Sequence, residues 1–235
     1  MIRRAIVPSL ALLLPLTALP SCASSGVSQG PAKVDDLVGW IERVYVEAEL
    51  AKERAQTAVA QLEAILASNF EGDPVSAYTQ FVESVRRSEA QAKRLAKQVE
   101  PMKAAAEPVF DQWQTNLESF ENERMKQRSA IRLANTRQRY EQILAAVVPA
   151  QEEYAKLNAA LRDHALFLGN DFNPEAVAEI QDEAKALITM AGELDRKFDA
   201  CMNSTRSYVE SSALPVHVTP APAPGGSASR FRRRR

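Results

Sequence analysis

The sequence predicts an all-α protein, an elongated antiparallel helical bundle or coiled coil of about four long helices. Apolar residues recur at alternating steps of three and four, and clusters of turn-forming residues divide this pattern into four stripes. Such alternation places every member of a stripe on one face of a slightly underwound helix. The composition agrees with a soluble helical body, since 46% of the residues are hydrophobic, 25% charged and only 6% aromatic.

The first stripe predicts a helix that begins near residue 33 and ends before a cluster of turn residues at 69–74. The middle of the stripe consists of alanines, which bury little area each but allow a neighbouring helix to approach closely. Its members are Val34, Leu37, Ile41, Val44, Ala48, Ala51, Ala55, Ala58, Leu62 and Ile65.

The second stripe keeps its phase past Pro101 and Pro108. Each proline removes a helix donor and crowds the preceding turn, so we expect a kink or a local break there. The polar stretch 121–128 predicts the second turn. The stripe consists of Tyr78, Phe81, Val85, Ser88, Ala92, Leu95, Val99, Met102, Ala106, Val109, Trp113, Leu117 and Phe120.

The third and fourth stripes meet at residues 169–174. Gly169 is expected to terminate one helix, and Asn173 followed by Pro174 is typical of an N-cap and the first turn of the next. Pro149 predicts another kink. The third stripe is Leu133, Thr136, Tyr140, Ile143, Val147, Ala150, Tyr154, Leu157, Leu161, His164 and Leu168. The fourth is Val177, Ile180, Ala184, Leu187, Ala191, Leu194, Phe198, Cys201, Thr205 and Tyr208.

Helices of this length are each about 55 to 70 Å long, and short turns make neighbours antiparallel. The simplest arrangement is an up-down-up-down rod with coiled-coil packing. A pair of long hairpins, or an open hairpin that self-associates, would bury the same stripes. The sequence leaves this choice open.

The first 22 residues have the pattern of an export signal. Arg3 and Arg4 precede an apolar stretch at 5–19 that is too short to span a bilayer, and Leu-Pro-Ser-Cys at 19–22 resembles the lipobox of bacterial lipoproteins. We therefore expect residues 1–22 to be a lipoprotein signal peptide and Cys22 to carry the lipid that holds the protein on a membrane. An ordinary signal peptide that leaves Cys22 as a plain thiol is the alternative.

This signal predicts a lipoprotein of the cell envelope that faces the periplasm. Ala23 stands where aspartate would favour retention in the inner membrane, so the outer membrane is the preferred location. Residues 23–32 are expected to form a short linker, and residues 33–212 the helical coiled-coil domain.

Residues 213–235 are predicted to be a disordered Pro/Ala/Gly/Ser linker with an arginine-rich end. Its five guanidinium groups suit an anionic envelope component or an acidic envelope protein. The export signal argues against nucleic acid, and a solvated tail without a partner is the alternative. The arginines are Arg230, Arg232, Arg233, Arg234 and Arg235.

The sequence contains no recognisable catalytic, cofactor-binding or metal-binding motif. Neither His164 nor His217 has a glutamate three residues before it, which argues against a di-iron bundle. We interpret His164 as a packing residue and Cys201, on the fourth stripe, as a buried inert thiol. Arg137 and Arg139 are expected to pair with acids on a neighbouring helix.

Three segments resemble the DUF2959 family of bacterial proteins. They are Phe-Asp-Gln-Trp at 110–113 with Leu117, Thr-Arg-Gln-Arg-Tyr at 136–140 after Leu133, and Asp-His-Ala-Leu-Phe-Leu at 163–168 followed by Asn173 and Ala176. The resemblance covers most of residues 33–212. It implies an exported helical protein and supplies no activity. The positions that carry it are Phe110, Asp111, Trp113, Arg137, Arg139, Tyr140 and Asn173.

Together these features predict a non-enzymatic, membrane-anchored lipoprotein that acts as a helical spacer, scaffold or adaptor. A ligand-binding or accessory-enzyme module that uses the bundle interior is the alternative.

Overall fold

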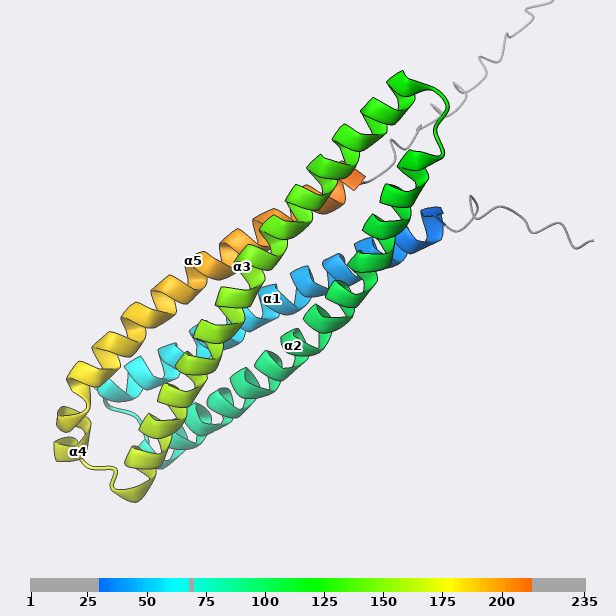
Figure 1. The fold of residues 1–235 in the computed structure, drawn as a ribbon. Coiled ribbons are helices and arrows are strands. Elements are labelled where there is room, and N and C mark those ends of the chain that lie inside the picture. The colour runs from blue at the N-terminus through cyan, green and yellow to red at the C-terminus, as the bar shows by residue number, and fades with distance from the viewer. Residues whose placement is uncertain (1–29, 68–69, 213–235) are drawn as a thin grey trace, which may run out of the picture.

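The computed structural model describes residues 30–67 and 70–212, and this part of the chain is helical without strands (Figure 1). The all-α prediction is therefore confirmed. Cys22, with the predicted signal peptide, and the arginines at 230 and 232–235 lie outside the described residues. The helices are α1 (Gly30–Leu66), α2 (Pro74–Glu118), α3 (Glu123–Asn170), α4 (Pro174–Glu179) and α5 (Gln181–Ser212).

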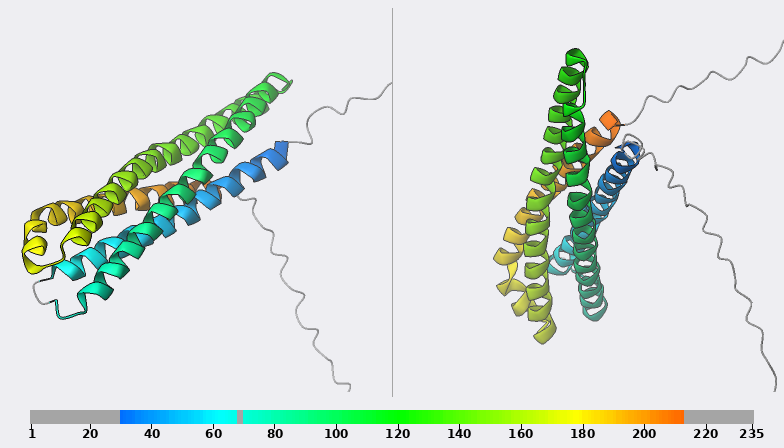
Figure 2. Two further views of the ribbon diagram at one scale, coloured as in Figure 1. Left: turned by 90° about the horizontal axis from the view of Figure 1, so that it is seen from below. Right: turned by 45° about the vertical axis from the view of Figure 1, so that its right-hand side comes forward.

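The four long helices form a closed antiparallel bundle within one chain (Figures 1 and 2). α1 packs along both α2 and α5, and α3 packs along the same two helices on the other side, while α1 and α3 touch little across the diagonal. This arrangement decides between the alternatives that the sequence left open, since both hairpins belong to one ring. No helix in the described part of the chain is long and apolar enough to span a bilayer.

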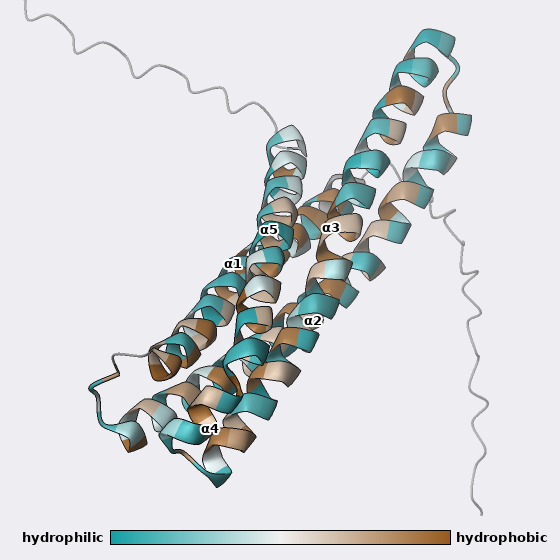
Figure 3. Cartoon of the chain, turned by 90° about the vertical axis from the view of Figure 1, so that its left-hand side faces the viewer, coloured by the Kyte–Doolittle hydropathy of each residue, from teal (hydrophilic) through white to brown (hydrophobic). Residues whose placement is uncertain are grey.

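The predicted stripes form the core (Figure 3). Every member of the first stripe from Leu37 to Ile65 is buried, including all four central alanines. The largest side chains that are fully enclosed come from the other helices, among them Phe81, Tyr154, Phe198 and Tyr208. Tyr154 and Phe198 meet edge to face, with their ring centroids 5.5 Å apart. Spacing alone thus identified the inward face of each helix.

Helix ends differ from the prediction at two places. α1 begins at Gly30, inside the expected linker. The turn expected at 121–128 is wrong, because α2 ends at Glu118 and α3 already begins at Glu123. The side chain of Asn122 accepts a hydrogen bond from the backbone nitrogen of Met125 at 3.1 Å and so caps α3. The polar residues that follow are exposed positions of a helix rather than a loop.

The local break expected in the second helix does not occur. α2 runs without interruption through Pro101 and Pro108, and α3 runs through Pro149. Pro108 is exposed, and the lost backbone hydrogen bonds are outweighed by the core packing of Val99, Met102 and their neighbours on the opposite face.

α3 ends at Asn170, within the predicted turn cluster at 169–174 and one residue beyond Gly169. A Cβ at Gly169 would lie only 2.3 Å from the hydroxyl oxygen of Tyr78, which donates a hydrogen bond to the Ala165 carbonyl at 3.1 Å. The glycine is needed for this close approach of α2. The expected cap is confirmed, because the Asn173 side chain accepts from the Ala176 nitrogen at 2.8 Å.

The fourth predicted helix is divided in two at Ile180, where α4 ends and α5 begins. Gln181, the first residue of α5, donates its side-chain amide to the Leu66 carbonyl at 3.0 Å. This bond satisfies a carbonyl at the C-terminal end of α1. The start of α5 is therefore bonded to the end of α1 at this end of the bundle.

The alanine seam of α1 predicts a specific response to larger residues. Ala55→Leu should lower the free energy of unfolding by about 1–3 kcal/mol, because the added atoms must displace α2 or α5 from a filled core. Ala60→Leu, on the exposed face of the same helix, is the control and should change it by less than about 0.5 kcal/mol. Urea denaturation followed by circular dichroism measures both. Equal effects would contradict close packing at the seam.

Candidate functional site

The α2–α3 hairpin projects beyond the other helices at one end of the bundle (Figures 1 and 2). Gln91 of α2 donates its side-chain amide to the Glu47 carbonyl of α1 at 3.0 Å, which places the start of α1 level with residue 108 of α2. α2 continues for ten residues beyond that level, to Glu118. At 1.5 Å per residue the hairpin therefore extends about 15 Å further than α1.

The base of this projection brings together residues from two of the family-like segments. Phe110 of α2 and Tyr140 of α3 are buried, with ring centroids 5.5 Å apart. The guanidinium carbon of Arg137 lies 5.4 Å from the centre of the Phe110 ring, within range of a cation–π interaction. Phe110 thus forms one cluster with two residues that follow it by 27 and 30 positions in the sequence.

The projecting part is held together by its own contacts. The Trp113 indole nitrogen donates to the Ser129 hydroxyl at 2.8 Å, and the ring is partly buried. Leu117, near the end of the hairpin, and Leu133, near its base, are buried. Trp113 therefore connects the two helices, and its bulk helps to fix their register.

The expectation that Arg137 and Arg139 pair with acids is wrong, since neither takes part in an ion pair among the described residues. Arg137 covers an aromatic ring instead. Arg139 donates a long bond to the Thr136 hydroxyl at 3.4 Å, and its buried Nε has no partner. Burial is the main cause that raises the pKa of the neighbouring Tyr140 to about 12. The nearby Tyr208 and Glu100 raise this pKa further.

The remaining family-like positions do not join this cluster. Asp111 is exposed on α2 and makes no described contact with Arg137 or Tyr140. Asn173 caps α4 at the opposite end of the bundle. The resemblance therefore marks two separate parts of the molecule, a hairpin joint and a helix cap.

A buried polar group that the sequence analysis did not identify connects α2 to α3. The Ser88 hydroxyl donates to the Asn158 side-chain oxygen at 2.6 Å, and the Tyr154 hydroxyl donates to the Ser88 carbonyl at 2.9 Å. Burial raises the pKa of Tyr154 to about 12, against the effect of its hydrogen bonds. A serine within the second stripe was the only sequence signal. Such a group fixes the register of the two helices, because unpaired polar atoms in a core are costly.

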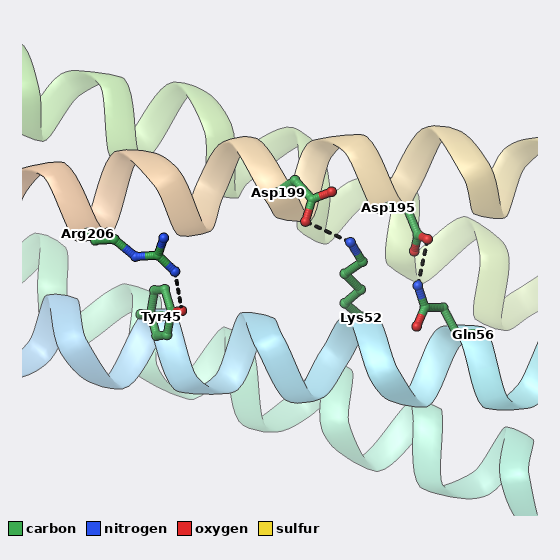
Figure 4. A network of polar contacts seen from close by, with 6 residues as sticks. All are labelled: Tyr45, Lys52, Gln56, Asp195, Asp199 and Arg206. Carbon is green, nitrogen blue, oxygen red and sulfur yellow. Dashed lines mark hydrogen bonds and ion pairs between the residues drawn. The ribbon is translucent and has the colours of Figure 1, made fainter.

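A row of polar contacts joins α1 to α5 along the surface (Figure 4). Lys52 lies 2.7 Å from Asp199, the Gln56 amide donates to Asp195 at 2.7 Å, and Arg206 donates to the Tyr45 hydroxyl at 2.8 Å. Exposed pairs of this kind contribute at most about 1 kcal/mol each. The contacts align two helices, and Tyr45 and Arg206 also line an open, mostly apolar hollow of about 540 Å³ between α1 and α5.

An apolar hollow of about 400 Å³ lies at the end opposite the hairpin. Leu66 and Phe70 line one side, and Phe172, Pro174 and Val177 line the other. The space is large enough for a small apolar ligand. It lies beside the connections between α1 and α2 and between α3 and α4, and not within the bundle interior.

His164 and Cys201 behave as packing residues. His164 is partly buried, with Nδ1 2.8 Å from the Ala160 carbonyl, and Asp163, Phe167 and Glu179 surround an open hollow beside it. Within residues 30–67 and 70–212, no group of three His, Cys, Asp or Glu side chains could hold a metal ion. Cys201 is fully buried, and burial raises the pKa of its thiol to about 12. The interpretation of Cys201 as a buried thiol is confirmed.

The fold and the hairpin cluster define an elongated four-helix bundle protein with one projecting helical hairpin. The chain belongs to the family described as "Protein of unknown function (DUF2959)", whose model matches residues 25–212. This match confirms the resemblance seen in the three segments. A search of the curated proteins and a search of the solved structures each find no match.

The buried tyrosines and cysteine predict a loss of stability in alkali. Burial is the largest cause that raises the pKa of Tyr140, Tyr154, Tyr208 and Cys201, in each case to about 12. The unfolded chain therefore loses these protons at lower pH than the folded chain. The stabilisation is complete below about pH 9, the unperturbed value for a thiol, and disappears as the pH rises to about 12.

Thermal melts between pH 8 and 12 measure this effect, and the midpoint should fall steadily over that interval. Tyr208→Phe, which removes one of the four groups, should make the decline less steep. A midpoint that stays constant to pH 12 would contradict the burial of these hydroxyls.

Proposed function

We propose that the protein is a non-enzymatic, membrane-anchored lipoprotein of the cell envelope that acts as a helical spacer, scaffold or adaptor. The observation that carries the proposal is the position of the chain ends in the bundle. α1 starts and α5 ends at the same end of the rod as the projecting hairpin, and the α1–α2 and α3–α4 connections lie at the other end (Figure 1). A lipid on Cys22 would therefore hold the whole rod by one end.

The packed interior supports a structural role. The four stripes fill the space between the helices with apolar side chains, and the buried polar residues Ser88 and Asn158 bond to each other. Long helices around such a core keep two ends of a molecule at a fixed separation. Recognition then depends on the outer surface and on the ends of the rod.

The arginine-rich tail would provide a second contact in this proposal. It follows α5 in the sequence and so starts from the end of the rod that the anchor holds. Its five arginines suit an anionic envelope component or an acidic protein surface. The outer membrane remains the preferred location.

The anchor is tested by metabolic labelling with palmitate. The wild-type chain should incorporate the label and stay in a carbonate-washed membrane pellet, because several acyl chains anchor stably. Cys22→Ala should abolish incorporation. Cys201→Ala is the matched control and should keep it, since that thiol is buried in the bundle. A wild-type chain without label would overturn the anchor.

The scaffold role is tested by crosslinking in native membranes, with the full chain compared with a chain that stops after Ser212. A partner captured by both chains would place the contact on the helical body. Capture by the full chain alone would assign it to the arginines. Absence of any specific crosslink in both would contradict the scaffold proposal.

The apolar hollow next to Phe70 and Phe172 favours one second candidate, a ligand-binding module. This candidate places the ligand at the end of the rod rather than in the bundle interior. A thermal-shift screen with small envelope lipids and metabolites separates the two proposals. A stabilising compound whose effect is lost in Val177→Asp would favour ligand binding, and no shift would favour the scaffold.

A further inference from the structure

The charges of the helical body are strongly segregated. The segment 124–139, at the start of α3, holds six lysines and arginines and no acidic residue. The rest of residues 30–212 holds 16 lysines and arginines against 30 aspartates and glutamates. An acidic rod thus carries one basic segment, and this segment lies on the projecting hairpin and at its base.

Three cations of this segment are fully available to a partner. Arg124, Arg128 and Arg132 follow one another at intervals of four residues, so they share one face of α3, and all three are exposed. Among the described residues, no lysine or arginine of the segment 124–139 forms an ion pair. The face therefore keeps its positive charge uncompensated by direct pairing.

Apolar side chains accompany these arginines. Met125 is 51% exposed and Ile131 is 56% exposed. Figure 3 shows brown, apolar positions among teal, polar ones along the projecting hairpin. Exposed apolar residues beside a row of cations are typical of helices that lie on a bilayer surface, where the apolar groups enter the headgroup region.

The geometry of the chain brings this hairpin to the membrane. Gly30, where α1 starts, stands eight residues after Cys22, and an extended chain of that length spans at most about 28 Å. The hairpin extends about 15 Å further than α1 toward the same side. A lipid on Cys22 therefore keeps the hairpin within reach of the bilayer.

We propose that the cationic face of the α2–α3 hairpin, with Arg124, Arg128 and Arg132, binds the anionic phospholipid headgroups of the membrane that anchors the protein. This inference rests on the anchor of the proposed function. Guanidinium groups bind phosphate in a bidentate manner, and the attraction decreases with salt. Glu118, Glu121 and Glu123 surround the connection itself, so the side of α3 rather than its extreme end faces the lipid. The rod is then inclined to the membrane.

The test uses the full lipidated chain with a fluorophore on Met125→Cys. Cys22 is occupied by lipid in the proposal, and the buried thiol of Cys201 does not react, so the label is specific. Val75→Cys, at an exposed position near the other end of the bundle, is the matched control. The protein is placed on vesicles of phosphatidylethanolamine with phosphatidylglycerol, or of phosphatidylcholine alone, and quenching by nitroxide-labelled lipid is measured.

We expect several-fold stronger quenching at position 125 than at position 75 on phosphatidylglycerol vesicles, and a loss of this difference on phosphatidylcholine or in high salt. The triple change of Arg124, Arg128 and Arg132 to Gln should abolish it while sedimentation with the vesicles persists. The same change at Arg86, Arg87 and Arg94 removes as much charge from exposed positions of α2 and should leave it intact. Melting curves confirm that both triple variants fold.

The outcomes separate this inference from the anchor. Sedimentation with equal quenching at both positions overturns the hairpin contact and leaves the anchor standing. Quenching at position 125 in a chain that takes up no palmitate supports the hairpin contact and overturns the anchor. A chain that fails to sediment with either vesicle contradicts both.

Discussion

The close contact of α1 with both α2 and α5 is the constraint on which the rest of the structure depends. Ala48, Ala51, Ala55 and Ala58 lie fully inside the seam and leave room for two helix backbones to approach. Each alanine buries little area, and the large residues of the facing helices, such as Phe81 and Phe198, fill the remaining space. Larger residues on α1 would separate the two hairpins and open the ring.

Much of the fold could be predicted because helix spacing and burial are linked by geometry. Apolar residues at alternating steps of three and four share one face of a helix, and the structure buries most of these positions. The errors concern local features that tertiary packing decides. A local break at Pro101 and Pro108 does not occur, because packing on the opposite face holds α2 together. Gly169 lies one residue before the end of α3 and leaves room for the Tyr78 hydroxyl.

The candidate site could be predicted only in part. Phe110 and Tyr140 were singled out through family resemblance, and the antiparallel hairpin explains why they meet. The sequence gives no sign that Asn158 bonds to Ser88, because a polar residue beside a stripe is usually exposed. The six cations at 124–139 were visible in the sequence. Their grouping on one exposed helix face depends on where the turn before α3 lies. A turn at 121–128 would have put three of them in a loop.

The unequal lengths of the helices have a consequence for motion. Beyond the start of α1, α2 and α3 have only each other as neighbours among the described helices (Figure 1), whereas Tyr154 in the body of the bundle contacts Ser88 of α2 and Phe198 of α5. Backbone amides of a two-helix segment open at a lower free energy than those of a four-helix core, in a step that leaves the core folded. We therefore expect the hairpin end to open before the four-helix core does. It can adapt its shape to a surface while the rest of the rod stays rigid.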